Sequence, residues 1–220
     1  MKQFDSKQEL EKELATAIAH ELKKAIKEFG NARLLLSGGS TPANLYNLLS
    51  GAQIDWSNVL VGLVDERFVP ISHPGSNEAL LIKTIQQNEA RDVRIVSMVA
   101  DASNEAANLV QVNKAYQPFI ERTDVVVLGM GEDGHTASLF PGDEQSEALL
   151  NGTANGIFST IAPVDPTNRI TCSKELLLNA PALFLMIVGE NKLTVYNKAA
   201  ANKYPISYFQ SNLAVYYAIK

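Results

Sequence analysis

The stretch that decides the fold is RLLLSGGSTPANLYNLL at residues 33–49, because a strand, a tight turn and a helix follow one another in it. A short apolar run (33–36) leads into SGGSTP (37–42), which is rich in glycine and hydroxyl side chains, and apolar residues then recur at helical spacing. Thr41 fits the N-cap of that helix, and Pro42 fits its first position, where no N–H is needed. The stretch predicts one strand–turn–helix unit of an α/β protein.

The same alternation of short apolar strands and amphipathic helices continues along the chain. A capping box, Ser6-x-x-Glu9, opens a helix that runs to a stop signal at Gly30. Further strands are expected at 59–64, 94–98, 124–128, 156–161, 183–188 and 213–218. Further helices are expected at 77–87, 103–121 (with a kink at Pro118), 175–179 and 192–201. This order is typical of a mostly parallel sheet with helices on both faces.

The sequence shows no sign of a division into several domains. The sequence shows no internal repeat, no low-complexity tract and no linker, so we expect a single α/β domain over residues 1–220. The loopiest stretch, 142–156, is interpreted as an excursion at the rim of a site rather than as a domain boundary.

Composition and charge exclude several classes of protein. With 46% hydrophobic and 20% charged residues, the chain is an ordinary globular one. Cys172 is the only cysteine, which excludes an internal disulfide framework and suits a reducing compartment. The net charge is −5 with no dense Lys/Arg block, so a nucleic-acid partner is not expected. No apolar signal segment opens the chain, and the longest apolar run (182–188) is far short of the roughly 18 residues of a membrane span, so we expect a cytoplasmic protein with no membrane partner.

Three polar segments follow predicted strands, and ligands of open α/β sheets bind at the carboxyl ends of the strands. In the first segment (37–42), two glycines expose backbone N–H groups, hydroxyls add donors, and the next helix points its positive end at the turn. An ordinary capped turn would look similar, but the flanking strand and helix favour an anion cradle, most naturally for a phosphate. The candidate contacts are Ser37, Gly38, Gly39, Ser40 and Thr41.

The second segment, Asp65-Glu66-Arg67, lies at the end of the strand expected at 59–64. Carboxylates can orient hydroxyl groups, and a guanidinium is well suited to holding an anion. A solvated charged loop is the plain alternative. The segment continues to His73 and Ser76-Asn77, and Ser76-Asn77 also has a plain use as the cap of the following helix.

The third segment, GMGEDGHTASLFPG (129–142), places three glycines before His135 where the chain leaves a buried strand. Gly131 and its neighbours let a ligand approach the backbone, His135 is a candidate base, and Asp133 is near enough to orient its ring. No second His or Cys stands at metal-ligand spacing, and no Gly-x-Ser-x-Gly elbow is present. Two cations, Arg169 and Lys192, complete the candidate residues.

Taken together, these segments resemble the 6-phosphogluconolactonase family. The matching stretches are SGGSTP (37–42), DERFVP (65–70), HPGSN (73–77), GMGEDGHTASLFPG (129–142), RIT (169–171) and GENK (189–192). They stand in the family's order over most of the chain, and the fourth is highly specific. Two departures, CSK at 172–174 and a C-terminus (213–220) without the family's Trp and acidic tail, leave these motifs untouched.

The resemblance implies a Rossmann-like fold related to glucosamine-6-phosphate deaminases. It also implies hydrolysis of 6-phospho-D-glucono-1,5-lactone to 6-phospho-D-gluconate in the pentose phosphate pathway, with no required cofactor. The residues themselves give no metal site, and no obligate protein partner is inferred. His135 is then the general base, oriented by Asp133, and Arg67 or backbone N–H groups of the 129–134 turn stabilise the oxyanion. Arg67 facing the phosphate instead remains an alternative.

The remaining binding roles follow the same resemblance. The phosphate is expected on the turn at 37–41, neutralised by Arg169 and Lys192, and Asp65 is expected to accept a sugar hydroxyl. Two other functions are weighed against this one. A deaminase is disfavoured by Arg67 and by TASLF (136–140), and a non-catalytic sugar-phosphate sensor would normally carry a DNA-binding domain.

Overall fold

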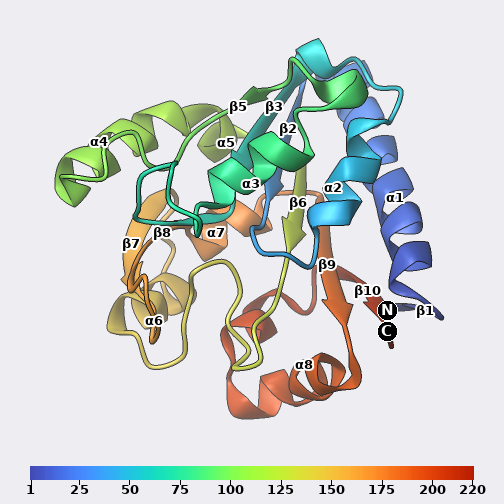
Figure 1. Ribbon diagram of the computed structural model, residues 1–220. Helices are drawn as coiled ribbons and strands as arrows, with labels where there is room; N and C mark the ends of the chain where they lie inside the picture. Colours follow the sequence, from blue (N-terminus) through green and yellow to red (C-terminus); the bar gives the residue numbers. More distant parts are fainter.

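The computed structural model describes all residues from 1 to 220, and its centre is a sheet of seven parallel strands (Figure 1). The strand order is β1-β10-β9-β6-β2-β3-β5. The bounds of these strands are β1 Lys2–Phe4, β2 Ala32–Leu36, β3 Val59–Leu63, β5 Arg94–Ile95, β6 Val125–Leu128, β9 Ala182–Val188 and β10 Leu213–Ala218. The prediction of a mostly parallel sheet is therefore confirmed, because every pairing within this sheet is parallel.

Helices cover both faces of the sheet, with α1 and α2 on one side and α4 and α5 on the other in Figure 1. The α-helices are α1 Lys7–Phe29, α2 Ala43–Ser50, α3 Asn77–Thr84, α4 Glu105–Ala115, α5 Gln117–Glu121, α6 Glu144–Asn151, α7 Lys174–Leu178 and α8 Glu190–Asn202. Three short 3₁₀ helices are η1 Trp56–Asn58, η2 Asn88–Ala90 and η3 Pro205–Phe209. The apolar faces of helices and strands meet in one core of 54 buried residues.

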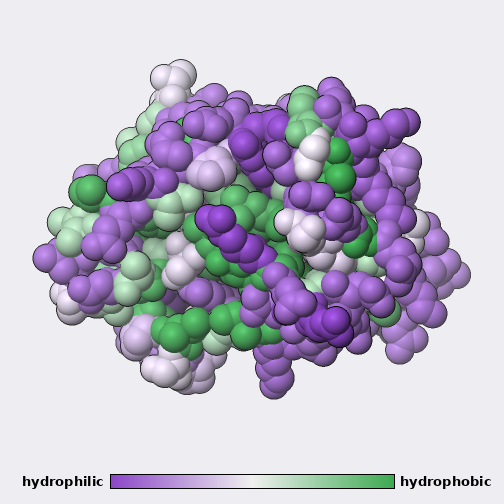
Figure 2. Space-filling model, turned by 90° about the horizontal axis from the view of Figure 1, so that it is seen from above, coloured by the Kyte–Doolittle hydropathy of each residue, from purple (hydrophilic) through white to green (hydrophobic).

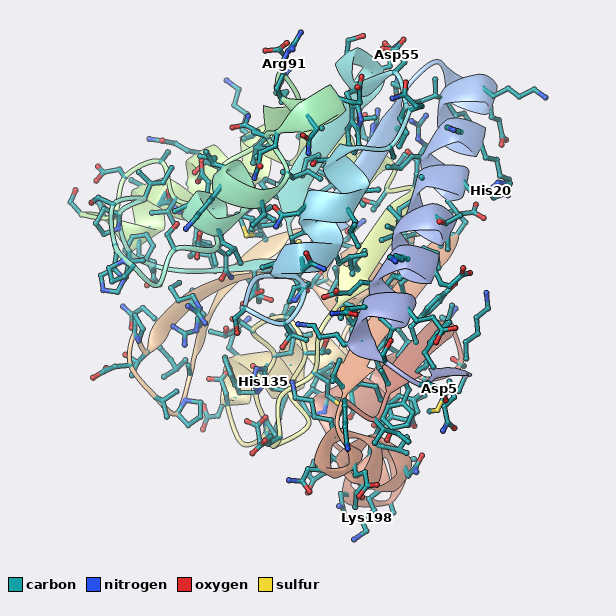
Figure 3. The ribbon with its side chains drawn as sticks, turned by 45° about the vertical axis from the view of Figure 1, so that its right-hand side comes forward. Asp5, His20, Asp55, Arg91, His135 and Lys198 are labelled. Carbon is teal, nitrogen blue, oxygen red and sulfur yellow. The ribbon has the colours of Figure 1, made fainter.

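The first helix follows the sequence signals closely. Ser6 Oγ accepts a hydrogen bond from the Glu9 N–H at 3.2 Å, and Gly30 ends the helix at a φ of 77°, a left-handed conformation that favours glycine. Its stripe of buried residues, which includes Leu10, Leu14, Ile18 and Leu22, packs toward the sheet. His20 lies on the exposed outer face of α1 (Figure 3).

A second, antiparallel sheet was not predicted. It consists of three strands in the order β4-β8-β7, namely β4 Asp65–Arg67, β8 Asn168–Cys172 and β7 Ile157–Ile161. The short charged strand β4 gives no periodic signal of its own, and it is held by pairing with β8, about a hundred residues later in the chain. This sheet matters for function because it fixes Asp65 and Arg67.

Other element predictions need correction. The helix expected at 103–121 is two helices separated by Tyr116, because Pro118 has no N–H to continue the first one. The stretch 142–156 is not all loop, since Asp143 caps α6 by accepting from the Ser146 N–H at 2.8 Å. Thr41 is not the N-cap of α2: Pro42 occupies that position, and no side chain caps the helix.

The seven strands run in the same direction, and the carboxyl ends of the central strands β6 and β9 point to the lower edge of the sheet in Figure 1. Figure 2 shows the opposite face, where hydrophilic surface surrounds a hollow with apolar atoms near its centre. His135 lies toward the lower end of Figure 3, whereas Asp55 and Arg91 mark the upper one. No helix is long and apolar enough to cross a membrane.

Candidate active site

A cavity of about 270 Å³ lies at the carboxyl edge of the parallel sheet, where the three polar segments converge. Nine of the twelve site residues predicted from sequence line it: Ser37, Gly38, Gly39, Thr41, Asp65, Arg67, Gly131, His135 and Lys192. The other three, Ser40, Asp133 and Arg169, do not line it. The remaining lining residues are Pro42, Asn77, Leu128, Gly129, Met130, Ala137 and Met186.

The turn at 37–42 forms one wall of the cavity. The Ser37 N–H extends the β2–β6 ladder by donating to the Val127 carbonyl at 3.1 Å. The buried Tyr46 hydroxyl donates to the Ser37 carbonyl at 2.6 Å, and burial raises the pKa of that phenol. Gly39 has a φ of 91°, which favours glycine. Because α2 begins without a side-chain cap, its first N–H groups remain free for an anion.

The second wall is built around Asp65, which is buried at the start of β4. Its Oδ2 accepts a hydrogen bond from Ser138 Oγ at 2.6 Å, and its backbone carbonyl accepts one from Asn77 Nδ2 at 3.0 Å. The Ser138 N–H in turn donates to Thr171 Oγ1 on β8 at 3.2 Å. Asp65 is therefore locked in place by three separate segments of the chain.

Glu66 and Arg67 have different roles although they are adjacent. Glu66 is 1% exposed and points away from the cavity, where it accepts hydrogen bonds from Ser76 Oγ and from the N–H groups of Arg67, Asn77 and Glu78. Burial raises the pKa of Glu66, although these hydrogen bonds oppose the rise. Glu66 thus closes the N-terminus of α3, and its role is structural.

Arg67 faces the cavity and is held by a hydrogen bond from its Nη1 to the Gly75 carbonyl at 2.7 Å. Its cross-strand neighbour is Arg169, which is 5% exposed and donates to the Pro166 carbonyl. Burial and the charge of Arg67 lower the pKa of Arg169. Neither guanidinium forms an ion pair with a carboxylate, although the charges of Asp65 and Glu66 act on Arg169 and oppose the lowering of its pKa.

His135 and Asp133 form the closest polar contact at the site. Nδ1 of His135 lies 2.5 Å from Asp133 Oδ1, and the same oxygen accepts from the His135 N–H at 3.1 Å. Burial pushes the pKa of Asp133 upward, but the hydrogen bonds and charge of His135 outweigh it and leave that pKa below its ordinary value. A side chain at Gly131 would overlap the His135 ring and the Asp133 carboxylate, so this position requires glycine.

The histidine turn is also fixed from outside. The His135 ring packs against Phe140 with centroids 4.8 Å apart. Tyr204 packs over Gly134, whose carbonyl accepts from the Ile206 N–H at 3.1 Å. Ala137 adopts a φ of 49°, a strained value for a residue with a side chain, directly at the cavity wall.

Lys192 reaches the cavity from the first turn of α8, which follows Gly189 at a φ of 97°. The cavity therefore has cationic groups on two sides, Arg67 on β4 and Lys192 on α8. No group of three or more His, Cys, Asp and Glu side chains is arranged to hold a metal ion. Chemically, the site offers a histidine–carboxylate pair, anion-binding donors and a carboxylate fixed by hydrogen bonds.

Sequence reasoning missed two polar contributors. Asn77 was placed at the end of the second polar segment, with a helix cap as its plain use and no site role assigned to it, yet its side chain lines the cavity. Ser138, which orients Asp65, carried no signal beyond its place in the 129–142 segment. Both contact residues more than ten positions away along the chain, and a local sequence pattern does not predict such contacts.

Comparison with known proteins agrees with this geometry. Residues 5–217 match the family model described as glucosamine-6-phosphate isomerases/6-phosphogluconolactonase. A 6-phosphogluconolactonase of Neisseria meningitidis is 35% identical over 210 residues, which cover 93% of this chain and 91% of the relative. One from Mesorhizobium japonicum is 38% identical over 202 residues, 90% of this chain and 84% of the relative.

A solved structure extends the likeness to three dimensions. The crystal structure of a 6-phosphogluconolactonase from Shewanella baltica superposes with a TM-score of 0.93 at 37% identity, over 99% of this chain and 96% of that one. The family model spans nearly the whole sequence, and these relatives match it over most of their own lengths. The chain therefore belongs to the glucosamine-6-phosphate isomerase/6-phosphogluconolactonase family.

Proposed function

We propose that this chain hydrolyses 6-phospho-D-glucono-1,5-lactone to 6-phospho-D-gluconate, the lactonase step of the oxidative pentose phosphate pathway. The relatives described above carry this activity in their names. The observation that carries the proposal is the 2.5 Å contact between His135 and Asp133 at the edge of a cavity that also holds an anion-binding turn. Lactone hydrolysis needs a base for water, a stabiliser for the carbonyl oxygen and a hold on the remote phosphate.

His135 acts as the general base. Nδ1–H of His135 donates a hydrogen bond to the Asp133 carboxylate, which leaves Nε2 with a free lone pair. Nε2 removes a proton from water as the water oxygen attacks the lactone carbonyl. The ring C–O bond then breaks, and the His135 imidazolium returns that proton to the departing ring oxygen, which leaves as the hydroxyl on C5. Proton transfer of this kind contributes roughly 10²–10⁴ in rate.

Arg67 stabilises the negative charge that develops on the carbonyl oxygen. Backbone donors of the histidine turn are the other candidates, but the N–H of Gly131 donates to the His135 carbonyl at 2.9 Å and that of Gly134 donates to the Gly131 carbonyl at 3.2 Å. These two groups are therefore already used inside the turn. Arg67 keeps donors free, because its guanidinium makes a single hydrogen bond within the protein, from Nη1 to the Gly75 carbonyl.

The phosphate binds at the turn formed by residues 37–41, against the uncapped N-terminus of α2. Lys192 neutralises it from α8, and Arg169 adds positive charge from β8, beside Arg67. Asp65 accepts a sugar hydroxyl. We further propose that residues 1–220 act as one domain, and that the enzyme works in the cytoplasm, where a charged sugar phosphate is retained.

A lactonase assay on the purified chain tests the proposal. Acid release from freshly prepared 6-phosphogluconolactone should exceed the spontaneous rate, and glucono-1,5-lactone should be poorer by orders of magnitude in kcat/KM because it lacks the phosphate that positions the carbonyl. Ammonia release from glucosamine 6-phosphate is measured in parallel. Equal efficiency on the two lactones, or ammonia release without lactonase activity, would contradict the proposal.

A further inference from the structure

Asn77 presents an unused hydrogen-bond acceptor to the cavity. It is the first residue of α3, it is 4% exposed, and it lines the cavity wall between Asp65 and the 37–42 turn. Its backbone N–H donates to Glu66 Oε1 at 2.8 Å, which fixes its position at the start of the helix. The side chain is therefore held rigidly, and its free polar atom has a defined direction.

The orientation of the Asn77 amide is determined by its partner. Nδ2 donates to the Asp65 backbone carbonyl at 3.0 Å, and a carbonyl oxygen can only accept. Turning the amide over would place two acceptors against each other, so the nitrogen must face Asp65 and Oδ1 must face the other way. No protein donor reaches Oδ1, and the atom is not sealed in the interior.

Gly38 shows where this amide lies. A Cβ at Gly38 would overlap the Asn77 side chain, so the amide packs directly on the 37–42 turn. The Asn77 acceptor thus lies beside the proposed phosphate site but does not bind the phosphate, because an ionised phosphate oxygen and an amide oxygen are both hydrogen-bond acceptors. The lactone carbonyl and the ring oxygen are acceptors as well. The substrate groups that fit an acceptor here are the sugar hydroxyls.

We propose that Asn77 Oδ1 accepts a hydrogen bond from one ring hydroxyl of the sugar lactone and makes the enzyme selective for a hydroxyl at that carbon. Asp65, joined to Asn77 through its own carbonyl, presents a second acceptor from the same wall. Two rigid acceptors side by side suit a polyol. A substrate that lacks the hydroxyl leaves Oδ1 buried without a donor, and such a site discriminates strongly. This inference rests on the proposed lactonase function.

A double-mutant cycle between enzyme and substrate tests the assignment. The kcat/KM of wild type and of Asn77→Ala is measured on 6-phosphogluconolactone and on its 2-, 3- and 4-deoxy analogues. For one analogue, the wild type should lose roughly 10-fold or more relative to the parent lactone, as expected for one hydrogen bond. In Asn77→Ala that ratio should fall toward one, because the partner of the hydroxyl has already been removed.

Ser76→Ala is the matched control. The substitution removes two hydrogen bonds at the same helix end: the one that Ser76 Oγ donates to Glu66 and the one that it accepts from the Ala79 N–H. Ser76 does not line the cavity. The variant should leave every deoxy ratio at the wild-type value. Asn77→Ser serves as a second variant should Asn77→Ala fold poorly, since its shorter side chain also withdraws the acceptor.

The outcomes separate the two proposals. If the deoxy ratios of both Asn77 variants equal those of the wild type while overall activity falls, Asn77 is only a support for Asp65 and the inference is wrong. If the wild type itself has no activity on the parent lactone, the proposed function fails instead.

Discussion

The two glycine-containing turns at the active site are built in opposite ways. The 129–142 turn is held largely by its own residues: Thr136 Oγ1 donates to the Gly129 carbonyl at 2.8 Å, and Gly131 leaves room for the His135 ring. The 37–42 turn is held by other elements, namely Tyr46 of α2 and Asn77 of α3. Both turns are recognisable from sequence, but only contacts within a turn follow from its local spacing, whereas the contacts that distant elements make with it do not.

The largest effect is expected at His135. Asn cannot take a proton from water, so His135→Asn should lower kcat by roughly 10²–10⁴ while KM changes little, because binding rests mainly on the other turn. Steady-state kinetics on the phospholactone measure this. His20→Asn, at the exposed histidine of α1, is the control and should behave as wild type. A folded His135→Asn enzyme with a near-normal kcat would remove His135 as the base.

The second prediction contrasts two neighbouring glycines of the 37–42 turn. Gly38→Ala places a Cβ on the Asn77 side chain, so the wall must move, and a shift of about 1 Å at an active site lowers the rate by roughly 10²-fold. The new Cβ of Gly39→Ala would meet no atom. The backbone at this position has a φ of 91°, however, and an alanine held there should destabilise the folded protein by about 1 kcal/mol. Gly38→Ala should therefore reduce kcat/KM far more, while Gly39→Ala lowers the unfolding free energy. Equal activity losses would show that the turn is not shaped by Asn77.

A third pair of variants removes one hydrogen bond from each turn. Tyr46→Phe leaves the buried Ser37 carbonyl without its donor, and Thr136→Val does the same for the Gly129 carbonyl. Each should lower the unfolding free energy by about 1–2 kcal/mol in urea denaturation. The kinetic effects should differ, with Tyr46→Phe mainly raising KM and Thr136→Val mainly lowering kcat. The same kinetic change in both variants would contradict separate roles for the two turns.

What the sequence could predict follows the same division between local and distant structure. The α/β class, the parallel sheet, the long first helix and the family are confirmed, because apolar periodicity, caps and the 129–142 motif are local signals. Strand β4 was missed because its stability comes from pairing with β8. Thr41 was misassigned as a cap because Pro42 is the N-cap of α2 and no side chain caps the helix, an arrangement that leaves the first N–H groups of α2 free for a ligand.

The site residues divide in the same way. The contact between Asp133 and His135 was expected from their spacing, and the structure shows it at 2.5 Å. Arg169 was expected at the phosphate, but it does not line the cavity: β4–β8 register places it beside Arg67, and its guanidinium donates to the Pro166 carbonyl. The register between two strands about a hundred residues apart cannot be predicted from the sequence of either strand alone. The catalytic and binding roles of all these residues remain predictions.

The smallest effect is expected from Asp133, and it concerns stability against pH. The hydrogen bonds and charge of His135 outweigh burial and lower the pKa of Asp133 in the folded protein, below the value of about 3.9 for an unfolded chain. The ionised carboxylate thus stabilises the fold above that pH, and the stabilisation is lost as the pH falls through the lower folded-state pKa. Because the Asp133 side chain is 43% exposed, solvent screening limits the contribution to less than about 1 kcal/mol.

Urea denaturation of wild type and Asp133→Asn at a series of pH values measures this contribution. The wild type should be more stable by a few tenths of a kcal/mol at pH 5, and the difference should shrink toward zero as the pH falls well below about 3.9. Asp101→Asn is the comparison on the exposed surface, where a hydrogen bond from Ser103 lowers the pKa of Asp101 without any histidine. Adding 1 M salt should reduce the Asp133 difference, because an exposed charge interaction is screened. A difference that grows on acidification would mean that the His135–Asp133 contact strains the 129–142 turn instead of holding it, and that Asp133 is kept at the site for chemistry rather than for stability.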